Sequence, residues 1–146
     1  MKRGDIVVLS VVVALLAGLG YLFFAVEREP SGSELGYAPV EVEGAQLLEA
    51  YAPSLEAVNV VVDIPVPYFA TVHESIGSAP GPMVGQSGIM ETGKRMISMV
   101  AQPLLTPGLT YIVLIHKDDG DGAFDIATDF PMMSGGVVLR ADVVAP

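Results

Sequence analysis

The chain begins with an unbroken apolar stretch and then changes to short alternating runs separated by Gly and Pro. The apolar stretch extends from Ile6 to Val26. As a helix with a rise of about 1.5 Å per residue, its roughly 21 residues span about 31 Å, enough to cross a hydrocarbon core of about 30 Å. We therefore expect a transmembrane signal-anchor helix at 6–26.

The charges on either side of this stretch predict its orientation. Lys2 and Arg3 precede it, and the net acidic triplet Glu27–Glu29 comes directly after it. Because basic flanks remain in the cytoplasm, residues 1–5 are expected to form a cytoplasmic tip, with the C-terminal part extracytoplasmic on a single-pass membrane protein. The alternative is a cleaved signal peptide, but Phe23–Ala25 is a poor cleavage site and the apolar run is longer than a usual h-region.

Residues 27–57 are expected to form a stalk or linker. Residues 27–39 are polar and carry Pro, Gly and Ser, a composition typical of flexible segments. Two alternatives are open for residues 40–51: Val40–Glu43 alternates like an edge strand, whereas Ala45–Tyr51 has the composition of a short helix ended by Pro53.

Residues 58–146 show the pattern of a β-sandwich domain. Short runs rich in β-branched residues are separated by turn residues, and helix signals are almost absent. The expected strands are Val58–Ile64, Tyr68–Glu74, Arg95–Ala101, Leu109–His116 and Gly136–Val144, with a loop at Ser75–Gly88 and a tight turn at Pro107–Gly108. We predict an all-β fold, an antiparallel β-sandwich.

Several short motifs occur in a fixed order from Asn59 to the C-terminus. They are Val60–Val62 (VVV), Val72–Glu74 (VHE), Val84–Ser87 (VGQS), His116–Asp118 (HKD), Asp119–Gly122 (DGDG) and Phe124–Asp125 (FD). This pattern resembles an uncharacterised domain-of-unknown-function family of exported and surface proteins of microbes, chiefly archaea. The resemblance implies an immunoglobulin-like exported sandwich and brings no established activity. The acidic loop of this chain is one residue shorter than the family pattern.

Composition narrows the classes of partner. The chain has 17 Asp or Glu against 7 Lys or Arg, a formal net charge of −10, and no cysteine. Such a balance argues against nucleic acid and against binding to anionic headgroups, but it permits cations and basic partners and keeps an exported domain soluble. The expected partners are the membrane, through the N-terminal helix, and a surface or envelope protein.

An acidic loop comes after the most apolar of the expected strands. Its carboxylates are Asp118, Asp119, Asp121, Asp125 and Asp129, around Gly120 and Gly122. Calcium needs six to eight oxygen ligands, which such a loop can supply. An EF-hand is excluded because its first ligand position holds Lys117 and its twelfth holds Thr128. The alternatives are a solvated Asp-Gly turn and a weak calcium site at Asp118, Asp119, Asp121 and Asp125.

A second metal hypothesis concerns the two histidines. His73 and His116, with Met83 and Met90, offer the imidazole and thioether ligands that favour copper(I). The alternative is two histidines at strand ends, with methionines that fill the core. A blue-copper centre is excluded because it requires a thiolate.

The sequence contains few features that support a catalytic function. Gly85–Ile89 lacks the second Gly of a G-x-S-x-G elbow, and a glycine-rich phosphate loop is absent from the sequence. We therefore expect no catalytic residues and no cofactor other than calcium. The leading function is a membrane-anchored, non-catalytic surface interaction or structural module, the second is an exported metal-binding protein for copper or calcium, and a hydrolase is third.

Overall fold

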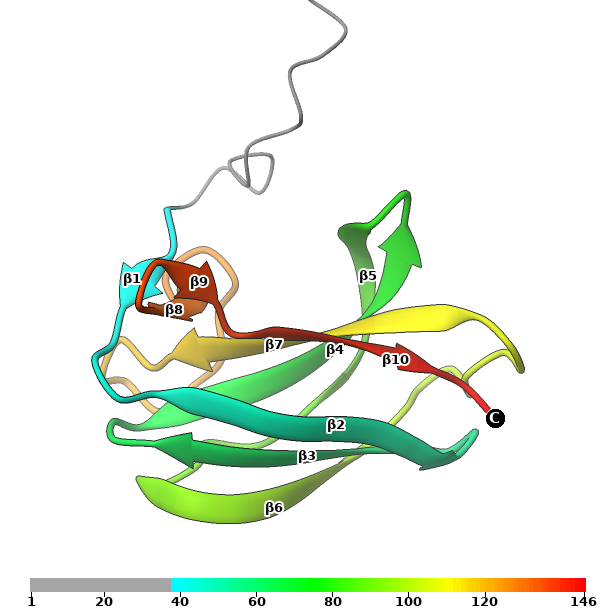
Figure 1. Cartoon of the computed structure of the whole chain (residues 1–146), viewed down its shortest axis with the longest axis horizontal. Helices are drawn as coiled ribbons and strands as arrows, with labels where there is room; N and C mark the ends of the chain where they lie inside the picture. Colours follow the sequence, from blue (N-terminus) through cyan, green and yellow to red (C-terminus); the bar gives the residue numbers. More distant parts are fainter. Residues whose placement is uncertain (1–37) are drawn as a thin grey trace, which may run out of the picture. The chain divides into compact units, whose positions relative to one another are not determined.

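The described part of the chain is built from strands alone. A computed structural model describes residues 38–146, which contain ten strands and no helix (Figure 1). The expected all-β class is therefore confirmed. The predicted cytoplasmic tip at 1–5, the transmembrane helix at 6–26 and the first part of the stalk lie outside the described residues. Across 38–146 we find no helix with the length and hydropathy needed to span a membrane.

The ten strands form three sheets. In chain order they are β1 (Val40–Glu41), β2 (Gln46–Ser54), β3 (Ala57–Ile64), β4 (Tyr68–Ile76), β5 (Ala79–Gln86), β6 (Gly93–Val100), β7 (Thr110–Lys117), β8 (Met132–Ser134), β9 (Val137–Val138) and β10 (Arg140–Val144). The two larger sheets have the orders β10-β7-β4-β5 and β2-β3-β6 and are antiparallel. The third, β1-β8-β9, pairs β1 with β8 in parallel.

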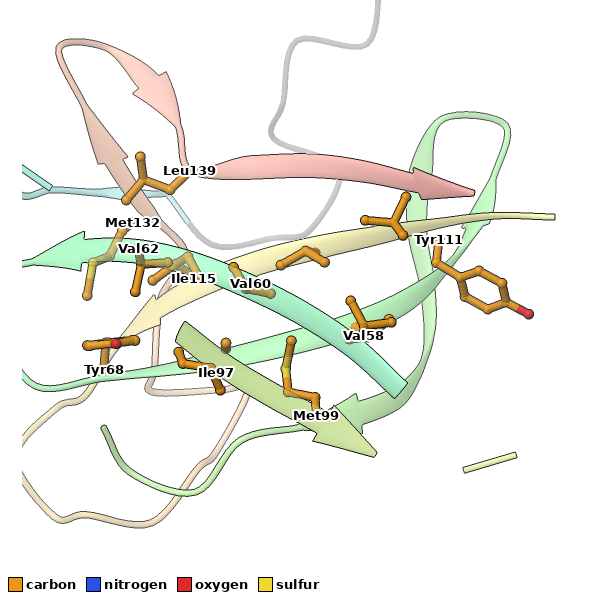
Figure 2. Packing of buried hydrophobic residues seen from close by; sticks show 14 of the residues in the cluster. Val58, Val60, Val62, Tyr68, Ile97, Met99, Tyr111, Ile115, Met132 and Leu139 are labelled. Atoms are coloured by element: carbon orange, nitrogen blue, oxygen red, sulfur yellow. The ribbon is translucent and has the colours of Figure 1, made fainter. Parts of the chain in front are cut away.

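The main core lies between the two larger sheets, in a β-sandwich-like arrangement (Figure 2). Alternate residues of each strand point to the same face, so β3 contributes Val58, Val60 and Val62, all fully buried. Val113 and Ile115 of β7 belong to the same cluster of buried side chains. Burial of β-branched and other apolar side chains from both sheets is the main stabilising term of such a fold.

The four-stranded sheet is buried on its outer face as well. Side chains that alternate with the core-facing ones are also buried: Phe69, Thr71 and His73 on β4, and Ile112, Leu114 and His116 on β7. Phe124, from the loop after β7, packs edge-on against both Phe69 and His116. A second buried layer therefore covers the outer face, and both predicted histidines lie in it.

The short-helix alternative for Ala45–Tyr51 is wrong. Residues 46–54 form β2, which pairs antiparallel with β3 along its length. The local helical composition is overridden because the backbone groups of β2 complete the edge of the three-stranded sheet. Strands β1 and β2 both fall within the region 27–57 that was expected to be a stalk or linker.

Two further elements differ from expectation. The segment Ser75–Gly88 contains β5 rather than only a loop, and its two prolines are tolerated because β5 is an edge strand that pairs with β4 alone. The expected strand Gly136–Val144 is interrupted at Leu139, whose N–H donates to Met132 and whose carbonyl accepts from Ile115. At Leu139 the chain therefore passes from the β1-β8-β9 sheet to the four-stranded sheet.

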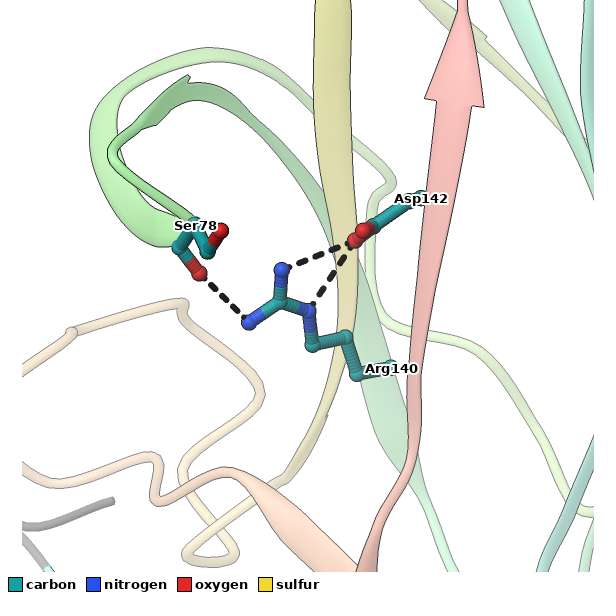
Figure 3. Close-up of polar contacts among 3 residues, drawn as sticks. All are labelled: Ser78, Arg140 and Asp142. Atoms are coloured by element: carbon teal, nitrogen blue, oxygen red, sulfur yellow. Dashed lines mark hydrogen bonds and ion pairs between the residues drawn. The ribbon is translucent and has the colours of Figure 1, made fainter. Parts of the chain in front are cut away.

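Two contacts fix β5 against its surroundings. A Cβ on Gly85 would lie 2.9 Å from the carbonyl oxygen of Val100, so only glycine allows this close approach of two backbones. At the other end, Arg140 forms an ion pair with Asp142 at 2.9 Å and donates to the carbonyl of Ser78 at 2.8 Å (Figure 3). The arginine thus joins β10 to the turn between β4 and β5.

Candidate functional site

The acidic loop begins where β7 ends. One carboxylate oxygen from each of Asp118, Asp119 and Asp121 lies within 4.8 Å of the others. Asp125, the fourth predicted ligand, is outside this group, and its Oδ1 accepts a hydrogen bond from the Ala127 amide at 2.8 Å. The loop therefore gathers three of the four predicted carboxylates at one point.

The same three aspartates shape the loop through their own backbone. Asp118 Oδ1 accepts from Gly122 N at 3.1 Å, Asp119 Oδ1 from Asp121 N at 3.2 Å, and Asp121 Oδ1 from Ala123 N at 2.8 Å. For Asp119 and Asp121 the donor is the amide two residues ahead, the local turn that the short aspartate side chain favours, whereas Asp118 reaches four residues ahead. Each carboxylate also has a second oxygen, which is the type of ligand that a hard cation prefers.

Asp129 joins the acidic loop to the buried outer face. Its side chain is fully buried, and its two oxygens accept from the amides of Asp119 at 3.0 Å and Asp125 at 2.7 Å. Its backbone carbonyl accepts from Nδ1 of His116 at 2.9 Å. One residue therefore closes the loop and orients a histidine.

The two histidines converge on one hydroxyl, although they come from different strands. His73 Nε2 lies 3.0 Å from Thr71 Oγ1, and His116 Nε2 lies 3.1 Å from the same atom. On the other side of each ring, Nδ1 faces a backbone carbonyl: Gly81 for His73 at 3.0 Å and Asp129 for His116 at 2.9 Å. We call His73, Thr71 and His116 the His–Thr–His cluster.

Burial determines the charge of this cluster. It lowers the pKa of His73, and the hydrogen bond to the Gly81 carbonyl only partly opposes the effect. For His116, burial lowers the pKa to about 4, against a raising contribution from the Asp129 carbonyl and with a further lowering by His73. Both imidazoles are therefore neutral near pH 7.

The predicted methionines separate into two groups. Met83 on β5 is the register partner of His73, so it is adjacent to the His–Thr–His cluster along the sheet. Met90 instead bridges to Tyr68 at the start of β4 and packs against the main core between the sheets. The structure thus brings the two histidines together and places Met90 with the main core.

Thr71, Gly81 and the buried role of Asp129 were not identified from the sequence. Thr71 lies two residues before His73, and the period of two in a strand places both side chains on one face, which is a signal that could have identified it. No protein-family model and no solved structure matches the chain. The geometry of the described residues is therefore the basis for assigning a function.

Proposed function

We propose that this chain is a single-pass membrane protein that displays an immunoglobulin-like β-sandwich outside the cytoplasmic membrane as a non-catalytic interaction or structural module. The observation that carries the proposal is the apolar run 6–26, with basic residues before it and a strongly acidic chain after it. Its partners are the membrane, through this helix, and a surface or envelope protein.

The order of the strands supports the immunoglobulin-like assignment. If the short strands β1, β8 and β9 are set aside, the first, second and fifth strands share one sheet and the third, sixth and seventh share the other. Immunoglobulin domains divide strands A, B, E and C, F, G in the same way. The fourth strand, β5, pairs with the third strand, β4, and not with the fifth, β6. It therefore has the position of an additional strand at the edge of the CFG sheet.

A tyrosine corner gives independent support. In immunoglobulin-like sandwiches, a Tyr near the start of strand F bonds through its hydroxyl to the backbone a few residues upstream. Tyr111 is the second residue of β7, the sixth strand in this order, and its hydroxyl accepts from the Thr106 amide at 2.8 Å. Pro107 and Gly108 form the expected turn between them, with φ of 76° at Gly108.

The acidic loop supplies the cation site of this proposal. Asp118, Asp119 and Asp121 would provide the carboxylate ligands of a calcium ion, with Asp125 as a further candidate. Calcium bound to the folded chain raises the free energy of unfolding in proportion to the logarithm of its concentration above Kd. The expected role is to stiffen the loop rather than to take part in chemistry.

Thermal unfolding of the full-length chain in detergent tests the calcium proposal. Millimolar calcium should raise Tm of the wild-type protein, and magnesium at the same concentration should raise it less. The double variant Asp119→Ala/Asp121→Ala should lose the calcium response. A calcium-induced shift of equal size in this variant, or no shift in the wild type, would remove the calcium site from the proposal.

Membrane extraction tests the anchor separately. The full chain should stay with the membrane fraction after washing at alkaline pH, whereas a variant that lacks residues 2–26 should be released. Release of the full chain by the same washing would contradict a retained transmembrane helix.

A further inference from the structure

We propose that the free edge of β6 binds an extended acidic segment of the partner protein, which adds to the three-stranded sheet as an antiparallel strand. The inference rests on the proposed role as an interaction module and names the chemistry of the partner. Its basis is a run of unpaired backbone groups on β6, together with two adjacent basic side chains and an exposed apolar one on the same strand.

Strand β6 is a regular edge strand. The order β2-β3-β6 gives it one neighbour, β3, with which it pairs without interruption from Gly93 to Val100 (Figure 1). The other edge strand of this sheet, β2, contains Pro53 and two irregularities of register, which hinder the addition of a further strand. Strand β6 has no proline and no bulge, so its backbone has the regular geometry that a further strand needs.

The end of β6 shows which of its backbone groups point away from β3. Ala101, the residue after the strand, donates its amide to Glu56, directly before β3, at 2.8 Å. The carbonyl of the preceding residue, Val100, faces β5 instead, since a Cβ on Gly85 would lie 2.9 Å from its oxygen. The backbone groups of successive residues point to alternate sides of a strand. The residues of β6 that share the direction of Val100 are Lys94, Met96 and Ser98.

These backbone groups have no partner within residues 38–146. No strand lies on this side of β6, and no loop or side chain of that region forms a hydrogen bond with the backbone of Lys94, Met96 or Ser98. Beyond Val100 the edge is closed by β5, because the Gln102 amide donates to the Val84 carbonyl at 2.6 Å. The open section therefore extends from Lys94 to Ser98, and an extended segment of about five residues can pair with it.

Two basic side chains at the start of the open section select an acidic partner. Lys94 is exposed and Arg95 is partly exposed. The one ion pair found within residues 38–146 joins Arg140 and Asp142, so neither side chain on β6 has a carboxylate partner there. Arg95 Nη2 donates to the Thr92 carbonyl at 3.0 Å, and its Nε has no hydrogen-bond partner. Charged side chains on an edge exclude strands of like charge, whereas carboxylates on the incoming strand convert this repulsion into attraction.

Antiparallel addition places each side chain of the partner beside one of β6. Lys94 and Arg95 are adjacent, so they lie on opposite faces of the strand, and two adjacent carboxylates on the partner would meet them, one on each face. Met96 is 63% exposed, and an apolar residue opposite it would remove both side chains from water. Because the partner runs in the opposite direction to β6, its segment has an apolar residue followed by two acidic ones.

A second copy of the chain fits this edge less well. Twofold pairing of β6 with itself would centre on Met96 and place Lys94 of each copy beside Ser98 of the other. No carboxylate would then meet Lys94 or Arg95, and the pairing would bring a second pair of basic residues to the edge. Charge complementarity therefore favours an acidic segment of another protein.

Binding of a labelled peptide tests the site. The probe is fluorescein-labelled Thr-Thr-Val-Val-Glu-Glu-Thr with blocked ends, titrated by fluorescence anisotropy with the full-length chain in an uncharged detergent at low salt. The peptide should bind saturably, and the same peptide with Lys in place of both Glu should bind about tenfold more weakly. Lys94→Glu should weaken binding of the Glu peptide about fivefold, whereas Lys117→Glu, the same change of charge on β7, should change it little.

Methylation of the peptide backbone separates strand addition from simple charge attraction. N-methyl groups on the second and fourth residues, which lie opposite Ser98 and Met96, should abolish binding because these N–H groups bond to β6. N-methyl groups on the third and fifth residues, whose N–H groups point to solvent, should leave binding nearly unchanged.

Several results would overturn the proposal. They are no saturable binding of the Glu peptide, equal binding of the Lys peptide, and equal loss from both methylated peptides. Rapid formation of a disulfide-linked dimer by Met96→Cys under mild oxidation, but not by the exposed Val144→Cys on β10, would also overturn it, because a second copy would then occupy the edge. The membrane-extraction and calcium tests involve neither β6 nor the peptide, so this inference and the proposed function fail separately.

Discussion

Replacement of Asp129 by alanine tests how the acidic loop is held. Its carboxylate accepts two backbone hydrogen bonds, from Asp119 and Asp125, and it is fully buried. A hydrogen bond to a charged group contributes about 1.5–3 kcal/mol. We take the lower limit of about 1.5 kcal/mol for each bond because both bonds are only partly buried.

The expected loss for Asp129→Ala is therefore about 3 kcal/mol in the free energy of unfolding. At about 4 °C per kcal/mol for a domain of this size, Tm should fall by about 12 °C. The assay is thermal unfolding of the full-length chain in detergent, monitored by circular dichroism, with calcium removed by chelation.

Asp121→Ala is the matched control, because Asp121 lies in the same loop but is exposed and its carboxylate accepts only from the nearby Ala123 amide. It should cost less than about 1 kcal/mol. Asp129→Asn keeps one acceptor and points an amide N–H at the other donor, so its cost should be intermediate. Equal Tm values for Asp129→Ala and Asp121→Ala would refute the assignment of Asp129 as the residue that closes the loop.

Three further predictions concern the fold and its pH dependence. Tyr111→Phe removes the hydroxyl that accepts a backbone hydrogen bond, and denaturant unfolding should show a loss of about 1 kcal/mol. Gly85→Ala places a Cβ about 2.9 Å from the Val100 carbonyl oxygen and should lower the free energy of unfolding by about 1–3 kcal/mol, whereas Gly88→Ala, with open space around it, should change it little. Burial lowers the pKa of His116 to about 4, so below its ordinary value of 6.5 the unfolded chain binds more protons than the folded one and stability falls as the pH falls. Unfolding measured from pH 7 downward should show this loss, by up to about 1.4 kcal/mol per pH unit, and His116→Gln should reduce it; an unchanged slope would contradict the buried neutral ring.

The central strands were predictable because their residues show a local signal. Val58–Ile64 and Leu109–His116 are rich in β-branched and apolar residues, and they correspond to β3 and β7 within one or two residues at each end. Strand β2 was ambiguous because its composition suits a helix, and only its pairing with β3 determines its structure. Strand β5 was missed because its prolines indicate a loop, and an edge position cannot be seen in local sequence.

The acidic loop and the His–Thr–His cluster also differ in how far the sequence predicts them. The acidic loop could be found because Asp118, Asp119 and Asp121 are adjacent in the sequence, so one short loop brings their oxygens together. The His–Thr–His cluster could not, because Thr71 and His116 are 45 residues apart and meet only through the register of β4 and β7. The backbone carbonyls of Gly81 and Asp129, which face the two rings, also cannot be identified from a residue pattern.

Labelling of single cysteines tests most directly whether the β-sandwich lies outside the cytoplasmic membrane. The chain has no cysteine, so Ser98→Cys, at an exposed position of β6, and Gly4→Cys, before the apolar run, can each be the sole thiol. In intact cells that express the full chain, a membrane-impermeant maleimide should label Ser98→Cys, and it should label Gly4→Cys only after the membrane is permeabilised. Labelling of Gly4→Cys in intact cells, together with protection of Ser98→Cys, would contradict the proposed topology.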